Sequence, residues 1–117
     1  MEANIVLNKL FEMRDVTHLA HLQTTNYNEH KVLNEFYDSI VGLADEFAEQ
    51  YQGATGMIIT NIGPISAKEG VIAKNYLKEC NDFFTDVRSK CKYNNVGATL
   101  DVILQTINKT NYLLTLV

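Results

Sequence analysis

Apolar residues recur every three or four positions in four stretches of this chain, which is the spacing of one buried helix face. We expect helices over about residues 2–25, 28–52, 66–89 and 96–116. The second stretch has the clearest stripe, and its members are Leu33, Phe36, Ile40, Leu43, Phe47 and Tyr51. With a single proline in the whole chain, the pattern predicts an all-α protein.

The other three stretches carry comparable stripes. The first comprises Val6, Leu10, Met13, Thr17 and Ala20; the third Ile72, Tyr76 or Leu77, Cys80, Phe83 or Phe84, and Val87; the fourth Leu100, Ile103, Ile107 and Leu114. We expect these side chains to form one core, as in a helix bundle.

Polar residues and glycines mark where the helices begin and end. Asn26 or Asn28 is the expected N-cap of the second helix, and Gly53 is the expected stop after it. Ser66 followed by Glu69 has the spacing of a capping box, so we expect the third helix to begin there.

The connector expected at residues 53–65 decides the topology. The second helix should be about 37 Å long, and an extended connector of this length reaches about 43 Å. A simple up-and-down bundle needs only a few residues at this point. We therefore expect one domain, residues 1–117, folded as a ferritin-like four-helix bundle with a long crossover between its second and third helices.

Composition narrows the function. The 117 residues carry a net charge of −4 and no run of Lys or Arg, so we expect no binding to nucleic acid and no basic membrane-surface patch. No apolar run reaches the roughly 18 residues of a membrane span, and we expect no signal peptide.

The two cysteines, Cys80 and Cys91, are expected to stay reduced. On one helix they would lie roughly 16 Å apart, which excludes a disulfide between them. Free thiols indicate a cytoplasmic location.

The candidate chemistry lies in HLAHLQTTNYNEH, residues 18–30, which holds all three histidines: His18, His21 and His30. Asp45 and Glu49 follow on the second helix. Histidines three residues apart and carboxylates four apart each share a helix face, and all are side chains that bind metal ions.

Geometry separates these groups within one chain. His21 and His30 flank the turn of the first helical hairpin, so we expect them at nearly the same level. Asp45 lies about 22 Å from His30 along the same helix, and Glu49 about 6 Å further. A metal bound at ~2 Å cannot join the two ends of one chain. The site would need His21 and His30 from one copy and Asp45 and Glu49 from an antiparallel mate, which gives two equivalent sites.

The residues His30, Asp45 and Glu49, with ADEFAE at 44–49, resemble the ferroxidase motif of the Dps mini-ferritins. His18 reproduces that family's usual separation from His30, whereas His21 fits its local histidine motif better, and we favour His21. The resemblance implies an iron site between subunits of a homodimer or larger homo-oligomer, where Fe(II) would be oxidised by peroxide or oxygen.

HLQTTNYNEH, YQG at 51–53 and YLLTLV at 112–117 also resemble short proteins of tailed bacteriophages. This likeness covers most of the chain and implies the cytoplasm of a host cell. It leads to an alternative function: a non-catalytic helical protein that acts by binding a host or phage protein, as a host-takeover or anti-defence factor or a minor virion component.

The chain departs from the mini-ferritin pattern in several ways. Leu22 replaces a tryptophan, the chain is shorter, and there is no basic tail. The third and fourth helices lack Glu-x-x-His, which excludes a full di-iron site within one chain. The sequence is therefore compatible both with a ferroxidase and with a protein that has no enzyme activity.

Structural explanations compete with the chemical ones. His21 could instead bond to Tyr27 or to backbone at the hairpin turn, and His18 is better explained as structural. Asp45 and Glu49 could be a solvated helix face. The aromatic residues Phe36, Tyr37, Phe47, Tyr51, Phe83 and Phe84 are expected in the core or a dimer interface.

Overall fold

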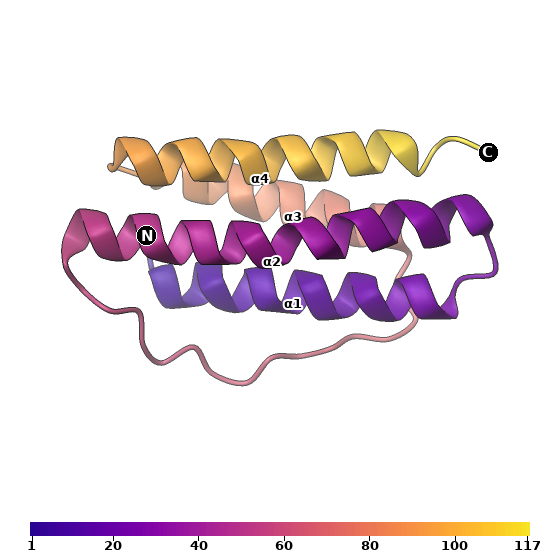
Figure 1. Cartoon of the computed structure of the whole chain (residues 1–117), viewed down its shortest axis with the longest axis horizontal. Helices are drawn as coiled ribbons and strands as arrows, with labels where there is room; N and C mark the ends of the chain where they lie inside the picture. Colours follow the sequence, from indigo (N-terminus) through magenta and orange to yellow (C-terminus); the bar gives the residue numbers. More distant parts are fainter.

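The computed structural model describes all 117 residues and consists of four α-helices without a strand. They are α1 (Ala3–Gln23), α2 (Tyr27–Thr55), α3 (Ala73–Lys90) and α4 (Asn94–Leu113). The helices lie side by side in a body measuring 45 × 26 × 20 Å (Figure 1). The predicted all-α class and the four helices are confirmed.

Two antiparallel hairpins, α1–α2 and α3–α4, make up the bundle, and their turns lie at opposite ends (Figure 1). Contacts join α1 to α2, α2 to α4, α4 to α3 and α3 to α1. Between α2 and α3 the connector runs back along the length of the bundle, so that α3 starts beside the α1–α2 turn (Figure 1). The long crossover expected from the sequence is therefore present.

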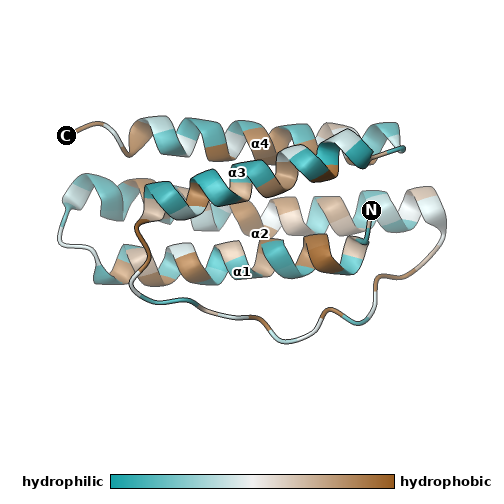
Figure 2. Cartoon of the chain, turned by 180° about the vertical axis from the view of Figure 1, so that it is seen from behind, coloured by the Kyte–Doolittle hydropathy of each residue, from teal (hydrophilic) through white to brown (hydrophobic).

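One apolar core fills the space between the helices. Its largest fully buried side chains include Phe36, Phe47 and Phe84, and the predicted residues Leu10, Met13, Leu100, Ile103 and Ile107 are also fully buried. Tyr37, Tyr51 and Phe83 are half-buried at the edges. Hydrophilic residues predominate on the outer side of α3 (Figure 2). None of the helices combines the length and hydropathy that crossing a bilayer requires.

Two predicted helix ends are wrong. The second helix continues past Gly53 to Thr55 and stops at Gly56, whose φ of 71° is left-handed and suits a residue without a Cβ. The third helix does not begin at Ser66. Gly70 has a φ of 70°, which no right-handed helix can contain, and α3 starts only at Ala73.

Residues in the predicted capping box have other roles. Glu69 accepts a hydrogen bond from Gln23 Nε2 at 3.1 Å instead of capping a helix. Ile72, expected in the core, is the N-cap of α3 and is 67% exposed. The predictions for Glu69 and Ile72 are wrong for the same reason: the crossover continues to residue 72, further than the local sequence suggests.

Either Asn26 or Asn28 was expected to cap α2, and the two residues have different roles: Asn26 directly precedes the helix and Asn28 lies in its first turn. Asn26 is the N-cap, and its side chain accepts from the Glu29 amide at 2.8 Å. Asn28 donates through Nδ2 to the carbonyls of Leu113 at 3.0 Å and Leu116 at 2.7 Å. It thereby ties the end of α4 to the start of α2.

Candidate functional site

The α1–α2 turn brings two of the predicted site residues together. His21 lies in the last turn of α1 and is 8% exposed, and His30 lies near the start of α2 and is half-buried. Their rings stack with centroids 3.7 Å apart and planes 17° from parallel. The prediction that these imidazoles lie at the same level is confirmed, and we call the pair the imidazole clasp.

Reciprocal hydrogen bonds hold the clasp. His21 Nδ1 lies 2.6 Å from the His30 carbonyl oxygen, and His30 Nδ1 lies 2.8 Å from the His21 carbonyl oxygen. A carbonyl oxygen only accepts, so each Nδ1 carries the proton and donates. Neither Nε2 has a hydrogen-bond partner in the chain. His21 thus bonds to backbone, as one of the structural explanations expected, and Tyr27 is not its partner.

His18 belongs to the same aromatic cluster but not to the clasp. Its ring stacks on Tyr37 at 4.2 Å, and Tyr37 also meets the edge of His21 at 5.3 Å. The Tyr37 hydroxyl donates to Asn34 Oδ1 at 2.6 Å. These contacts agree with a structural explanation for His18.

The predicted carboxylate ligands lie elsewhere. Asp45 and Glu49 are exposed on the second half of α2. Since α2 is one continuous helix, Asp45 is about 22 Å from His30 along its axis. No group of three or more His, Cys, Asp or Glu side chains in the chain is placed to hold a metal ion. A site that combines the two histidines with Asp45 and Glu49 therefore remains a prediction, and it requires two copies of the chain.

The clasp limits how a metal could bind. A metal-bound histidine usually donates its other ring N–H to a carbonyl or carboxylate, which is the role that Nδ1 has in both rings here. An ion bound at Nε2 lies in the plane of its ring. Two nearly parallel planes do not meet within bonding distance, so the stacked rings could bind one ion each but not share one.

A second polar cluster, which sequence reasoning missed, lies between α1 and α3. Glu12 is only 8% exposed, and its two oxygens pair with Lys9 at 3.0 Å and with Lys68 of the crossover at 3.3 Å. Tyr76 and Cys80 of α3 are buried beside it. We call Glu12, Tyr76 and Cys80 the polar seam. The sequence did contain a signal for the burial of Glu12: the apolar residues Met13 and Val16, next to it and one helical turn later, are both buried.

Burial and charge act in opposite directions in the polar seam. Burial by itself would raise the pKa of Glu12, but hydrogen bonds and charges from Lys9 and Lys68 hold that pKa below its usual value. Burial raises the pKa of the Cys80 thiol to about 11 and raises that of Tyr76 further. Glu12 is therefore a carboxylate at neutral pH, while Tyr76 and Cys80 are protonated.

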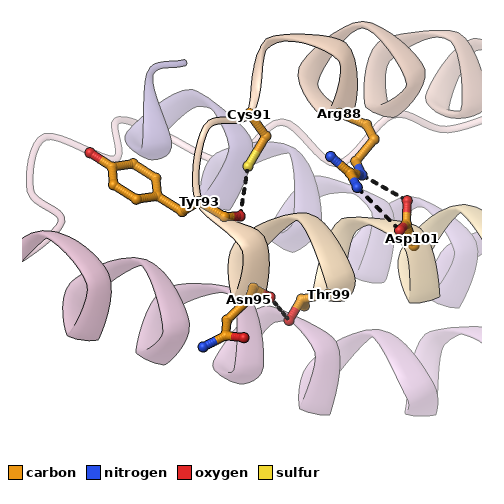
Figure 3. Close-up of polar contacts among 6 residues, drawn as sticks. All are labelled: Arg88, Cys91, Tyr93, Asn95, Thr99 and Asp101. Carbon is orange, nitrogen blue, oxygen red and sulfur yellow. Dashed lines mark hydrogen bonds and ion pairs between the residues drawn. The ribbon is translucent and has the colours of Figure 1, made fainter.

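The α3–α4 turn at the other end is held by an ion pair (Figure 3). Arg88 donates through Nε to Asp101 Oδ1 at 2.8 Å and through a terminal nitrogen to Oδ2 at 3.4 Å. The guanidinium covers Gly97, where a Cβ would lie 2.9 Å from it. Cys91 is a free thiol that donates to the Tyr93 carbonyl at 3.4 Å. Cys80 is also free, as expected.

Comparison with known proteins identifies one family. Its model, described as a family of unknown function (DUF5856), matches residues 21–114. The matched segment begins at His21 and contains His30, Asp45 and Glu49. No curated protein matches the chain, and no solved structure matches it either.

Proposed function

The chain belongs to the DUF5856 family of unknown function, and we propose that it is a metal-binding four-helix protein whose site is shared between two copies. The observation that carries the proposal is the imidazole clasp. Both Nδ1 atoms donate to backbone carbonyls, which leaves both Nε2 lone pairs for a ligand outside the chain.

In this proposal His21 and His30 bind metal from one copy, and Asp45 and Glu49 bind it from an antiparallel mate. The acids are exposed and therefore accessible to that mate. Because the stacked rings cannot share an ion, each imidazole would hold its own, and the mate's carboxylates would supply further ligands.

The metal we propose is iron, and the fold is proposed to be ferritin-like, in agreement with the crossover topology. Fe(II) would be the substrate of a ferroxidase reaction with peroxide or oxygen. The clasp would orient the imidazoles, and the carboxylates would neutralise the charge of the bound ions. A homodimer is the smallest assembly that completes the site, and the proposed location is the cytoplasm, of a host cell if a bacteriophage encodes the chain.

Metal content tests this proposal directly. Protein purified without an affinity tag is loaded anaerobically with Fe(II), and bound metal is measured by elemental analysis. We expect stoichiometric iron in the wild type and loss of most of it in Glu49→Ala. Glu35→Ala is the matched control, because Glu35 is also exposed on α2. Equal iron content in the two variants would refute the assignment of Glu49.

Mixing variants tests whether the site is shared. In a dimer of one His30→Ala chain and one Glu49→Ala chain, one site loses both ligands and the other keeps both. A refolded equimolar mixture should therefore regain about a quarter of the wild-type metal. A site built within one chain would regain none. Circular dichroism on His30→Ala checks that the helices persist without the clasp.

A second candidate function is supported by the same clasp. The imidazoles are already bonded to backbone and stacked, which is sufficient to explain why they are present. The chain would then be a non-catalytic helical protein that acts by binding a host or phage protein. This proposal expects no stoichiometric metal, and unchanged metal content and oligomeric state in Glu49→Ala.

A further inference from the structure

The crossover is attached to the bundle in an unusual way. No residue from 57 to 71 takes part in a backbone–backbone hydrogen bond. Its polar attachments are side-chain contacts, mostly from α1, so the segment lacks the hydrogen-bond ladder that makes helices resist opening. We call residues 57–71 the strap.

The attachments of the strap are few. Asn8 donates to the carbonyls of Ile62 at 2.8 Å and Pro64 at 3.0 Å, and Asn4 donates to that of Asn61 at 3.2 Å. Lys68 pairs with Glu12 at 3.3 Å. Further contacts come from Gln23 and Gln52, and Ile59, Ile62 and Val71 pack against the core while half-buried.

Gly56, just before the strap, and Gly70, near its end, have a conformation that other residues rarely adopt, as do Asn61 and Gly63 between them. Gly56 has a φ of 71° and Gly70 a φ of 70°. No atom lies within 4 Å of the position where a Cβ would stand at either residue. The glycines are therefore required by backbone conformation rather than by crowding, and such residues absorb the dihedral changes of hinges.

One polar group of the seam has no hydrogen-bond partner in the closed state. The Tyr76 hydroxyl is buried with no hydrogen-bond partner, which has a free-energy cost. Glu12 has one oxygen on Lys68 and keeps the other on Lys9. If Lys68 moves away, water can reach Glu12, so opening exchanges one polar contact for hydration.

We propose that the strap is a lid that moves away from α1 by backbone rotation at Gly56 and Gly70 while the four helices stay folded, with the Lys68–Glu12 ion pair as its catch. Opening removes Lys68 from Glu12 and thereby admits solvent and small molecules to the polar seam between α1 and α3. The lid does not rest on the proposed metal site.

Cys80 reports on the lid, because it is fully buried in the seam beside Tyr76. With Cys91→Ser as background, Cys80 is the only thiol. We measure its reaction with a chromogenic aromatic disulfide at several urea concentrations below the unfolding transition. A lid that opens locally gives a rate that hardly changes with urea, because little surface is exposed. A rate that follows global unfolding down to zero urea would overturn the proposal.

Variants locate the catch. Lys68→Gln should raise the Cys80 reaction rate about three- to tenfold, as expected for loss of one ion pair. Lys78→Gln is the matched control, because Lys78 is exposed on α3 and has no ion pair. Equal rates in these two variants would overturn the role of Lys68.

A second pair of variants tests the strap itself. Asn8→Ala removes two attachments and should also raise the rate, whereas Asn108→Ala, at an exposed position on α4, should not. Thermal melting of every variant must stay close to that of the background protein for the rates to report opening. Asn8→Ala reacting no faster than Asn108→Ala would overturn the lid.

Discussion

The two hairpins of this bundle are closed by different chemistry. At the α1–α2 turn, two imidazoles stack and donate to backbone carbonyls, and His21 is 8% exposed. At the α3–α4 turn, Arg88 and Asp101 form an ion pair with side chains 40% and 48% exposed. The first turn depends on burial and direct backbone contact, and the second on charges that water and salt screen.

This difference shows which turn can carry function. The Arg88–Asp101 pair neutralises the charge of both partners, and both side chains remain in contact with water. The imidazole clasp uses only one nitrogen of each ring and leaves the other nitrogen without a partner. A polar contact that closes a turn and still has binding capacity is the better candidate for a site.

The largest expected effect is breaking the clasp. His21→Ala removes a buried ring, its stack and its hydrogen bond, and we expect the free energy of unfolding to fall by about 2–3 kcal/mol. Chemical denaturation measures it. His18→Ala, which loses a stack on Tyr37 but no hydrogen bond, should cost less. If the two variants lose the same stability, the reciprocal bonds contribute nothing.

The buried ion pair of Glu12 should have the next largest effect. Glu12→Gln should lower the free energy of unfolding at pH 7 by about 1–2 kcal/mol. The folded pKa of Glu12 lies below the unfolded value of 4.5, so this stability is present above pH 4.5 and disappears as pH falls through the folded pKa. Denaturation from pH 7 to pH 3 should show the wild type converging on the variant. Glu35→Gln, at an exposed position, is the control and should change neither value.

The exposed pair should matter less and respond to salt. Arg88→Ala should destabilise the protein by less than His21→Ala does, and about 1 M NaCl should remove the difference from wild type. The loss in His21→Ala should persist at that salt concentration, because His21 bonds to a backbone carbonyl and stacks on His30 rather than forming an ion pair. A salt-resistant loss in Arg88→Ala would mean that packing on Gly97, rather than charge, closes this turn.

Gly97→Ala should have the smallest effect. The new Cβ would meet the end of the Arg88 side chain at 2.9 Å, which can move aside at the cost of the ion pair. Alanine's higher helix propensity offsets that loss, so stability should stay within about 1 kcal/mol of wild type. The sharper readout is salt: Gly97→Ala should lose the salt dependence of the wild type. If the variant keeps the salt dependence, Arg88 still pairs with Asp101 in another side-chain conformation.

The apolar stripes predicted most of the fold. Leu33, Phe36, Ile40 and Phe47 are buried as expected, because periodicity along a helix determines which side faces the core. The position of His21 and His30 at the same height along the hairpin was also predictable, since a short turn between two helices leaves little freedom in their register. The metal-site hypothesis required a second copy from the start, and the chain alone does not test it.

What the sequence by itself determined is local: four amphipathic helices, two tight turns and a crossover long enough to return along the bundle. The tertiary structure alone decided that Glu12 is buried under Lys68, that Arg88 covers Gly97, and that α3 begins at Ala73 rather than Ser66. The physical reason is the sequence separation of the interacting residues. Helix periodicity depends on residues three or four positions apart, whereas burial of a polar group depends on segments that meet only when the chain has folded.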